Sequence, residues 1–439
     1  LLISLFQDDL PPVLIYSLKG WINLYQDKLD TSLIEFNNLG STDLKFDLGS
    51  YYSAIAYTKK AHNEKALKIL MDKNTNFKVF GKIFEIFKYE VTTLSGDVEK
   101  ANNALKISID EYPNDITLKE LYRNTKENWY ENYQIFKNQF SGISDTLLLF
   151  ARGESRQINQ KLVELFYCQL AYFLNDKDAR YKLRLAIALN DTGLFKEAEK
   201  LLNSISSSDL FYIESRLLLA NILNENGETE KSIYLLKNLS ENQYNSPEIF
   251  ELMGNIYRYN EKFKLAETSY SNAINLNNVS EFNNQNLWLL YFFRGITLEQ
   301  QKNYDKSKQD LRNSLSLSPN QPQVLNYLGY MLIEQKENLN EALDMIRKAV
   351  NISPQSGYII DSLAWGFYQL GRYSEAIEPM ERAIELEPED PIINDHLGDV
   401  LWKIGRKREA YFQWKKALLF NPTKELKIEI QKKISFGLE

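Results

Sequence analysis

The chain has 439 residues, of which 44% are hydrophobic and 25% charged, with only 11 prolines and 18 glycines. This composition predicts a folded chain rather than a disordered one. The net charge of -7 argues against a nucleic-acid partner, because phosphate binding requires clustered Lys and Arg side chains. No apolar run approaches the roughly 18 to 20 residues that a membrane span needs.

The first third of the chain has a weak helical repeat. Apolar and small residues recur every three or four positions in paired runs, around Gly20 to Phe36, Ala54 to Leu70 and Gly96 to Pro113. Two such runs separated by a short turn predict a helical hairpin. We therefore expect residues 1–140 to form an N-terminal block of divergent hairpins.

A junction is expected next, over residues 141–178. The stretch from Ser141 to Asp145 has the composition of a turn followed by a helix start. Roughly two degenerate hairpins are expected between Asn114 and Asp178. We interpret this region as a boundary between two blocks of hairpins.

Residues 179–424 carry the clearest signal, an internal repeat. Pro388 follows Pro354 by 34 residues and precedes Pro422 by 34. Each interval holds two apolar runs split by a turn, with Gly371 and Gly405 at matching positions. The pattern continues backward and predicts seven consecutive hairpins. Small residues at fixed positions are expected where two helices approach closely. They include Ala364, Ala376, Gly398 and Ala410.

The last residues, 425–439, read as one more amphipathic helix rich in Lys and Glu. A repeat array needs a terminal element with a polar outer face to stay soluble. We expect this helix to cap the array.

The 34-residue units of residues 179–424 resemble the tetratricopeptide repeat, a helix-turn-helix unit of about 34 residues. The resemblance implies an all-α fold, a right-handed α-solenoid of stacked hairpins with about 10 to 11 repeats. Strings such as Ile393 to Asp399 and Gly357 to Leu363 also resemble an alphaproteobacterial family of repeat proteins with no settled activity. That narrower resemblance implies a bacterial protein, with the cell envelope or periplasm favoured over the cytoplasm.

No catalytic constellation is recognisable in the sequence. The chain has two histidines, one cysteine, and neither a Gly-rich phosphate loop nor a nucleophile motif. We therefore expect no enzyme activity, no cofactor and no metal. One alternative stays open, because Asp361, Asp395 and Asp399 share repeat positions and could together offer carboxylates to a hard cation.

The resemblance also implies a binding groove on the first helices of the C-terminal hairpins. The residues expected to line it are aromatic and acidic. They are Tyr330, Tyr358, Asp361, Trp365, Tyr368, Asp395, Asp399 and Trp402. Exposed Trp and Tyr side chains act as anchors at protein interfaces. The acidic character predicts a basic or amphipathic peptide or protein as the partner.

The sequence thus favours a non-catalytic scaffold that holds a peptide or protein in its groove. An alternative is the regulatory or substrate-recruiting arm of an enzyme or envelope assembly whose other part lies outside this chain. The chain opens at Leu1 in a helical pattern, which leads us to expect an upstream segment.

Overall fold

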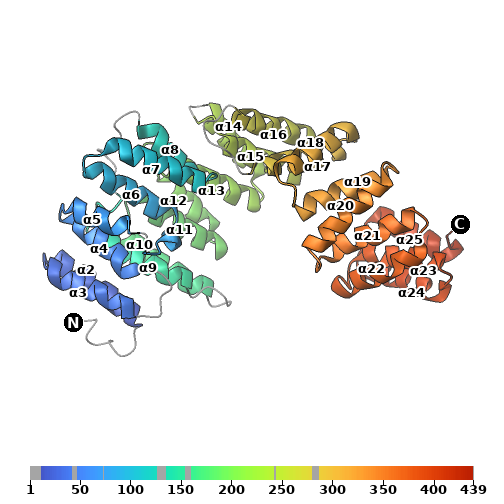
Figure 1. The fold of residues 1–439 in the computed structure, drawn as a ribbon, viewed down its shortest axis with the longest axis horizontal. Helices are drawn as coiled ribbons and strands as arrows, with labels where there is room; N and C mark the ends of the chain where they lie inside the picture. Colours follow the sequence, from blue (N-terminus) through green and yellow to red (C-terminus); the bar gives the residue numbers. More distant parts are fainter. Residues whose placement is uncertain are drawn as a thin grey trace. The chain divides into compact units, whose positions relative to one another are not determined.

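A computed structural model describes residues 11–41, 47–72, 74–125, 135–153, 160–241, 244–278 and 286–438. Within these ranges all regular structure is helical and no strand occurs. The expected all-α fold of stacked helical hairpins is confirmed (Figure 1). The described residues divide into two compact units, 11–256 with 275–278, and 257–274 with 286–438.

The first unit contains the hairpins of the N-terminal half and the short 3-10 helices η1 (Leu39–Ser41) and η2 (Lys78–Phe80). Its helices are α2 (Pro12–Tyr25), α3 (Leu29–Asn38), α4 (Leu48–Lys59), α5 (Asn63–Leu70), α6 (Lys82–Leu94), α7 (Val98–Glu111), α8 (Ile116–Asn124), α9 (Ser141–Gly153), α10 (Gln160–Leu174), α11 (Ala179–Asp191), α12 (Phe195–Asn203), α13 (Tyr212–Glu225) and α14 (Thr229–Glu241).

The division between the units falls within α15 (Pro247–Tyr259) and α16 (Phe263–Asn278). The second unit continues with α17 (Leu287–Gln300), α18 (Tyr304–Leu317), α19 (Pro322–Glu334), α20 (Leu339–Ile352), α21 (Gly357–Gln369), α22 (Tyr373–Leu386), α23 (Pro391–Lys403), α24 (Lys407–Leu419) and α25 (Lys424–Phe436). Helices α11 through α24 lie in the stretch for which seven hairpins were predicted.

Turns between paired helices need a residue with positive φ. Gly371 and Gly405 supply it with φ of 71° and 86°. Glycine adopts this conformation without the steric cost that a Cβ atom brings. The turn between α19 and α20 is one residue longer, and Asn338 takes the left-handed conformation there.

Small residues allow the two helices of a hairpin to approach, as expected. In the last hairpin a Cβ atom on Gly398 would lie 2.3 Å from Nε1 of Trp414. Trp414 is fully buried between α23 and α24, and Ala410 on the same helix is also fully buried. The packing of this hairpin therefore depends on the absence of a side chain at position 398.

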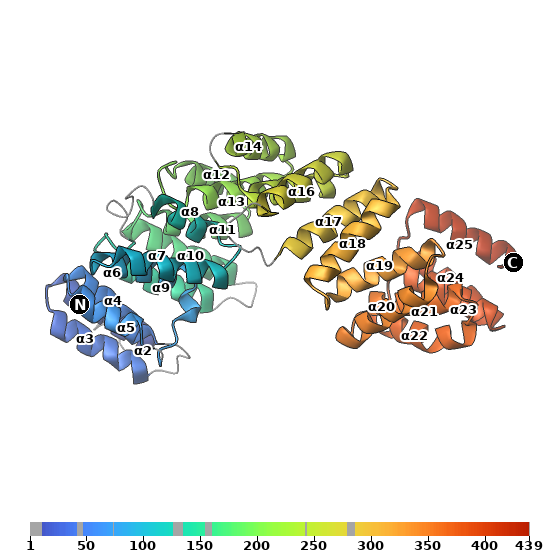
Figure 2. The same ribbon diagram turned by 45° about the horizontal axis from the view of Figure 1, so that its top comes forward.

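The first unit has two layers of hairpins, which the repeat pattern did not predict. Helix α9 packs on α2, and α13 packs on α8, so the chain after Ser141 returns along the earlier helices (Figures 1 and 2). A Cβ atom on Gly142 would lie 2.2 Å from the Trp21 ring, and the Tyr52 hydroxyl lies 2.8 Å from Oγ1 of Thr146. The predicted blocks 1–140 and 141–178 thus lie together in one unit.

The last helix packs onto the end of the second unit. Ile430 of α25 is fully buried in a cluster that includes Leu397, Val400 and Trp414 of the last hairpin. In Figure 2, α25 lies above α24 and α23, next to the C-terminus. Helix α25 therefore covers apolar side chains of the last hairpin.

Candidate functional site

A cleft of about 740 Å³ runs along the second unit. Most of its lining comes from α17, α19, α21 and α23, which are the first helices of four consecutive hairpins. The lining residues are Glu299, Gln300, Tyr304, Asn326, Tyr327, Tyr330, Met331, Glu334, Gln335, Tyr358, Asp361, Ser362, Asp390, Ile392, Ile393 and His396.

The helical period explains why these residues share one surface. Residues four apart on a helix lie on the same face, as do Asn326, Tyr330 and Glu334 of α19. Stacking of the hairpins then places the equivalent face of α21, with Tyr358 and Asp361, next to it. The cleft is thus a continuous surface made from one face of each first helix.

The cleft is rich in tyrosine and carboxylate. Its lining contains four tyrosines, four carboxylates and neither Lys nor Arg. Tyr358 is 55% exposed, whereas Tyr330 is half-buried. Burial raises the pKa of Tyr330, and the charges of Glu334 and Asp361 raise it further. The negative potential of these carboxylates favours a cationic group in the cleft.

Two of the carboxylates hold neighbouring aromatic side chains. Oε1 of Glu334 accepts a hydrogen bond of 2.7 Å from Nε1 of Trp365, and Oε2 of Glu299 accepts one of 3.2 Å from the Tyr327 hydroxyl. Each carboxylate fixes an aromatic ring at the cleft while keeping its negative charge. The Tyr327 ring, which lines the cleft, is therefore pre-oriented for contact with a bound molecule.

Asp361 is paired with His396 at the floor of the cleft. Nδ1 of His396 lies 2.9 Å and 3.1 Å from the two carboxylate oxygens of Asp361. Burial lowers the pKa of His396, but the charge and hydrogen bond of Asp361 outweigh it, so the pKa lies above its ordinary value. The Trp365 ring stacks on His396 with centroids 4.0 Å apart and on Tyr368 with centroids 4.7 Å apart.

Asp395 and Asp399 lie under the C-terminal helix instead of in the cleft. Nζ of Lys433 on α25 lies 2.7 Å from each carboxylate, and Nε1 of Trp414 donates to Asp399 at 2.9 Å. Burial and the charge of Asp399 raise the pKa of Asp395 to about 6, although Lys433 opposes the shift. Trp402 is held nearby, since its Nε1 donates to the backbone oxygen of Leu438 at 2.9 Å.

The structure therefore distributes the expected groove residues over three places. The cleft is lined by Tyr330, Tyr358 and Asp361. Trp365 and Tyr368 stack on each other beside it. The other three, Asp395, Asp399 and Trp402, are held at the C-terminal end by Lys433 and Leu438. The carboxylates of Asp361, Asp395 and Asp399 were expected to line one groove, but each is buried and bonded to a lysine or a histidine. The repeat period correctly predicted that these aspartates lie on the first helices of their hairpins. It could not predict that α25 packs over Asp395 and Asp399.

Sequence reasoning missed Tyr327, Tyr304 and Asp390 as cleft residues. Tyr327 lies three residues before Tyr330 and so shares its helix face, a signal that was available. Asp390 caps α23 by accepting hydrogen bonds from the backbone nitrogens of Ile392 and Ile393. Asp-Pro before an apolar run is typical of a helix start, but it does not reveal which surface the cap faces.

A metal site at the three aspartates has no geometric support. Asp361 is bound to His396, whereas Asp395 and Asp399 share Lys433. In the described ranges no group of three or more His, Cys, Asp or Glu side chains is arranged to hold a metal ion. Nor does any helix there have the length and apolarity to cross a bilayer.

Two stretches of the chain match known families. Residues 367–405 match the family described as TPR repeat, and residues 290–321 match the tetratricopeptide repeat family. Both stretches fall in the second unit and include helices that line the cleft. No curated protein is significantly similar to the chain.

Solved structures with a similar arrangement include other repeat proteins. Yeast Tom70 is 14% identical, with 97% of this chain and 95% of that chain covered and a TM-score of 0.41. A tetratricopeptide repeat protein from Parabacteroides merdae is 15% identical, with 58% and 98% covered and a TM-score of 0.46. YrrB, described as a TPR protein with an unusual peptide-binding site, is 15% identical, with 45% and 97% covered and a TM-score of 0.35. Similarities at this level carry no information about function.

Proposed function

We propose that this tetratricopeptide repeat protein is a non-catalytic scaffold that binds a basic or amphipathic segment of a protein partner in the cleft of its second unit. Repeat arrays of this class are interaction modules in general. The single observation that supports the finer proposal is the lining of the cleft, which has four tyrosines and four carboxylates and neither Lys nor Arg.

The chemistry of the cleft suits a cationic, partly apolar ligand. Tyrosine buries a large area at low entropic cost and accepts cations over its ring. Tyr358 is exposed and free to make such contacts, and Ile392 beside it offers an apolar surface, 48% exposed. A Lys or Arg side chain would be attracted by the carboxylates, while apolar side chains would cover the rings.

The proposal is tested with two synthetic helical peptides of equal length and apolar pattern, one carrying Lys and the other Glu at every polar position. Fluorescence anisotropy should show binding of the Lys peptide only, weakening as salt is raised because Glu299, Glu334 and Asp390 are at least partly exposed to solvent. Tyr358→Ala should weaken binding about tenfold, as truncation of an aromatic anchor commonly does.

Tyr234→Ala is the matched control, since Tyr234 is 68% exposed and lies in the first unit. It should leave the affinity unchanged. Equal binding of both peptides, or equal affinity of the Tyr358→Ala variant and wild type, would contradict the proposed cleft. In that case the alternative role, an arm of a larger enzyme or envelope assembly, would have to use another surface.

A further inference from the structure

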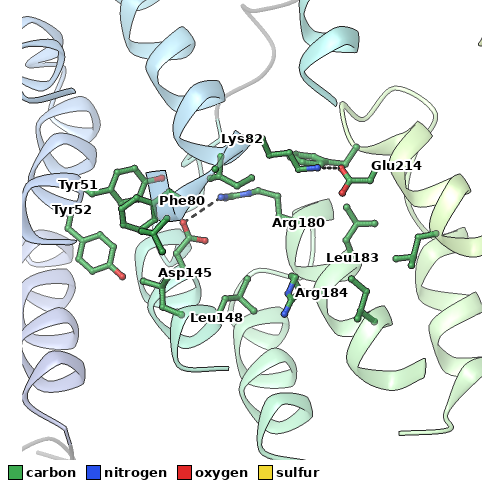
Figure 3. A pocket seen from close by; sticks show the side chains of 17 residues that line it. Tyr51, Tyr52, Phe80, Lys82, Asp145, Leu148, Arg180, Leu183, Arg184 and Glu214 are labelled. Carbon is green, nitrogen blue, oxygen red and sulfur yellow. Dashed lines mark hydrogen bonds and ion pairs between the residues drawn. The ribbon is translucent and has the colours of Figure 1, made fainter. Parts of the chain in front are cut away.

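A second pocket, of about 400 Å³, lies inside the first unit (Figure 3). It is formed where the two layers of hairpins face each other. Helices α4 and α6 contribute side chains from one layer, and α9, α11 and α13 contribute from the other. Its volume is within the range of about 300 to 1,000 Å³ that is usual for small-molecule sites.

Most of the wall of this pocket is apolar. Phe80, Leu148, Leu183, Ile187, Phe211 and Leu218 all line it. The ring of Phe80 stacks on Tyr51 with centroids 4.0 Å apart, which makes one end of the wall aromatic. Such a wall favours a ligand that is mostly hydrocarbon, because hydrocarbon gains free energy when it leaves water for an apolar surface.

The acidic side chains of the pocket are already bonded to protein groups. Glu214 accepts from Nζ of Lys82 at 2.6 Å and from Oγ1 of Thr117 at 2.6 Å. Asp145 accepts from the Tyr181 hydroxyl at 2.6 Å and lies 3.5 Å from Nη1 of Arg180. The dashed lines of Figure 3 mark ion pairs of these carboxylates with Lys82 and Arg180. Since each carboxylate is compensated, the pocket does not demand a cationic ligand.

Two donors of the lining remain without a partner. Within the described residues, the Tyr51 hydroxyl and Nε of Arg184 are buried and make no hydrogen bond. Tyr51 is only 1% exposed, and Nη2 of Arg184 donates to Glu164 at 2.7 Å. A buried polar group without a partner is costly, so both groups point to a ligand that supplies an oxygen acceptor. The guanidinium of Arg184 is already ion-paired with Glu164 through Nη2, and its Nε remains able to donate to one further acceptor. Arginine has no acceptor atom, and a carboxylate oxygen is its strongest partner.

We propose that this pocket binds a single-chain fatty acid, with its hydrocarbon chain along the apolar wall and its carboxylate accepting from Arg184 or Tyr51. This site is separate from the cleft of the second unit and independent of the proposed scaffold function. The two proposed ligands also differ in charge. The cleft favours a cationic segment, whereas this pocket favours an anionic amphiphile.

The proposal is tested by titrating the full chain with dodecanoate at pH 8, below its micelle concentration, using calorimetry and native mass spectrometry. We expect one molecule to bind per chain. Ile187→Trp should abolish binding, because the indole fills the pocket from a position that is only half-buried. An equal affinity of this variant and wild type, or no binding to wild type, would overturn the proposal.

The role of the carboxylate is tested separately with Arg184→Met, which keeps the apolar stem and removes the guanidinium. It should weaken dodecanoate binding by about tenfold or more, since hydrogen bonds to charged groups are worth that much. Binding of dodecanol should change little. Lys182→Met on the same helix is the matched control, because Lys182 does not line the pocket. Equal affinity of wild type for dodecanol, dodecanoate and dodecylamine would overturn the assignment of a carboxylate.

Discussion

Position 398 shows how one missing side chain sets the packing of a hairpin. A Cβ atom there would meet the indole of Trp414, which is fully buried and hydrogen-bonded to Asp399. The ring cannot move without losing that hydrogen bond and its contacts in the core. Gly398 is therefore a structural requirement of the helix crossing and not of the turn.

Gly398→Ala should lower the free energy of unfolding by about 1 to 3 kcal/mol, the usual cost of overpacking a core. Thermal melts followed by circular dichroism measure the change. Gly40→Ala is the control, since a Cβ atom at Gly40 meets nothing within 4 Å and the residue has no positive φ. A Gly398→Ala melt as high as that of the control would show that α23 and α24 can separate freely.

The pair of Asp361 and His396 gives a dependence of stability on pH. In the folded chain the pKa of His396 is raised by Asp361, so the pair contributes fully below the unfolded pKa of about 6.5. That contribution is lost as the pH rises through the raised folded pKa. Stability due to this pair must therefore decrease toward alkaline pH.

Asp361→Asn should destabilise the chain by about 1 to 3 kcal/mol at pH 6, because it removes a charge-assisted hydrogen bond from a buried site. The difference from wild type should be smaller at pH 9. Urea unfolding at the two pH values measures it. Asp305→Asn, at a side chain that is 97% exposed, should show no such dependence on pH. A constant gap for Asp361→Asn would refute the pairing with a charged histidine.

At the scale of elements, α25 is joined to the array by a partly buried cation as well as by apolar contacts. Lys433 is the shared partner of Asp395 and Asp399, and Asp399 in turn holds Trp414. Removal of a cation from two buried carboxylates leaves them without compensation, which costs more than the pair itself contributes. The attachment of α25 therefore depends on the charge of Asp395 and Asp399, the two carboxylates of α23 that Lys433 contacts.

Lys433→Met should destabilise the chain by about 3 kcal/mol at pH 8, as breaking a buried ion pair commonly does. The loss should be smaller at pH 5, because Asp395, whose pKa is about 6 in the intact chain, takes up a proton there. Thermal melts at both pH values measure this. Lys432→Met changes an exposed neighbour and should have little effect. A greater loss at pH 5 than at pH 8 would contradict the assigned roles.

The sequence was sufficient to predict the helical hairpins and their turns, because those depend on local spacing. Gly371 and Gly405 recur with the period and indicate the turns, and Ala364 is one of the small residues that indicate where two helices cross. The neighbours of each site residue were less predictable. Lys433 has no counterpart in the repeat, so its contact with Asp395, 38 residues earlier, could not be inferred from the period.

At the scale of the whole molecule, the two units have different internal organisation. The second unit is a succession of hairpins in which each contacts its neighbours. The first unit joins two layers through contacts such as Tyr52 with Thr146 and Trp21 with Gly142. A period of 34 residues is the same whether hairpins continue in one row or return in a second layer, so the sequence could not distinguish the two.

Amide hydrogen exchange should show this difference directly. Gly142→Ala places a methyl group against Trp21 and should raise exchange in α2 and α9 together, although they lie far apart in the chain. Gly398→Ala should raise exchange in α23 and α24 and leave α2 and α9 unchanged. An effect of Gly142→Ala that is limited to α9 would show that the layers are not coupled through Trp21.

The contact between Trp21 and Gly142 also determines when the first unit can be completed during synthesis. The ribosome must add 121 residues between these two positions. At roughly 5 to 20 residues per second, this interval takes on the order of 6 to 24 s. Throughout that time Trp21 lacks its covering layer, and Tyr51 and Tyr52 join this uncovered aromatic face once they have been synthesised. Until the second layer is added, this aromatic face is open to contacts with other chains, which is the general hazard of apolar surface exposed during folding.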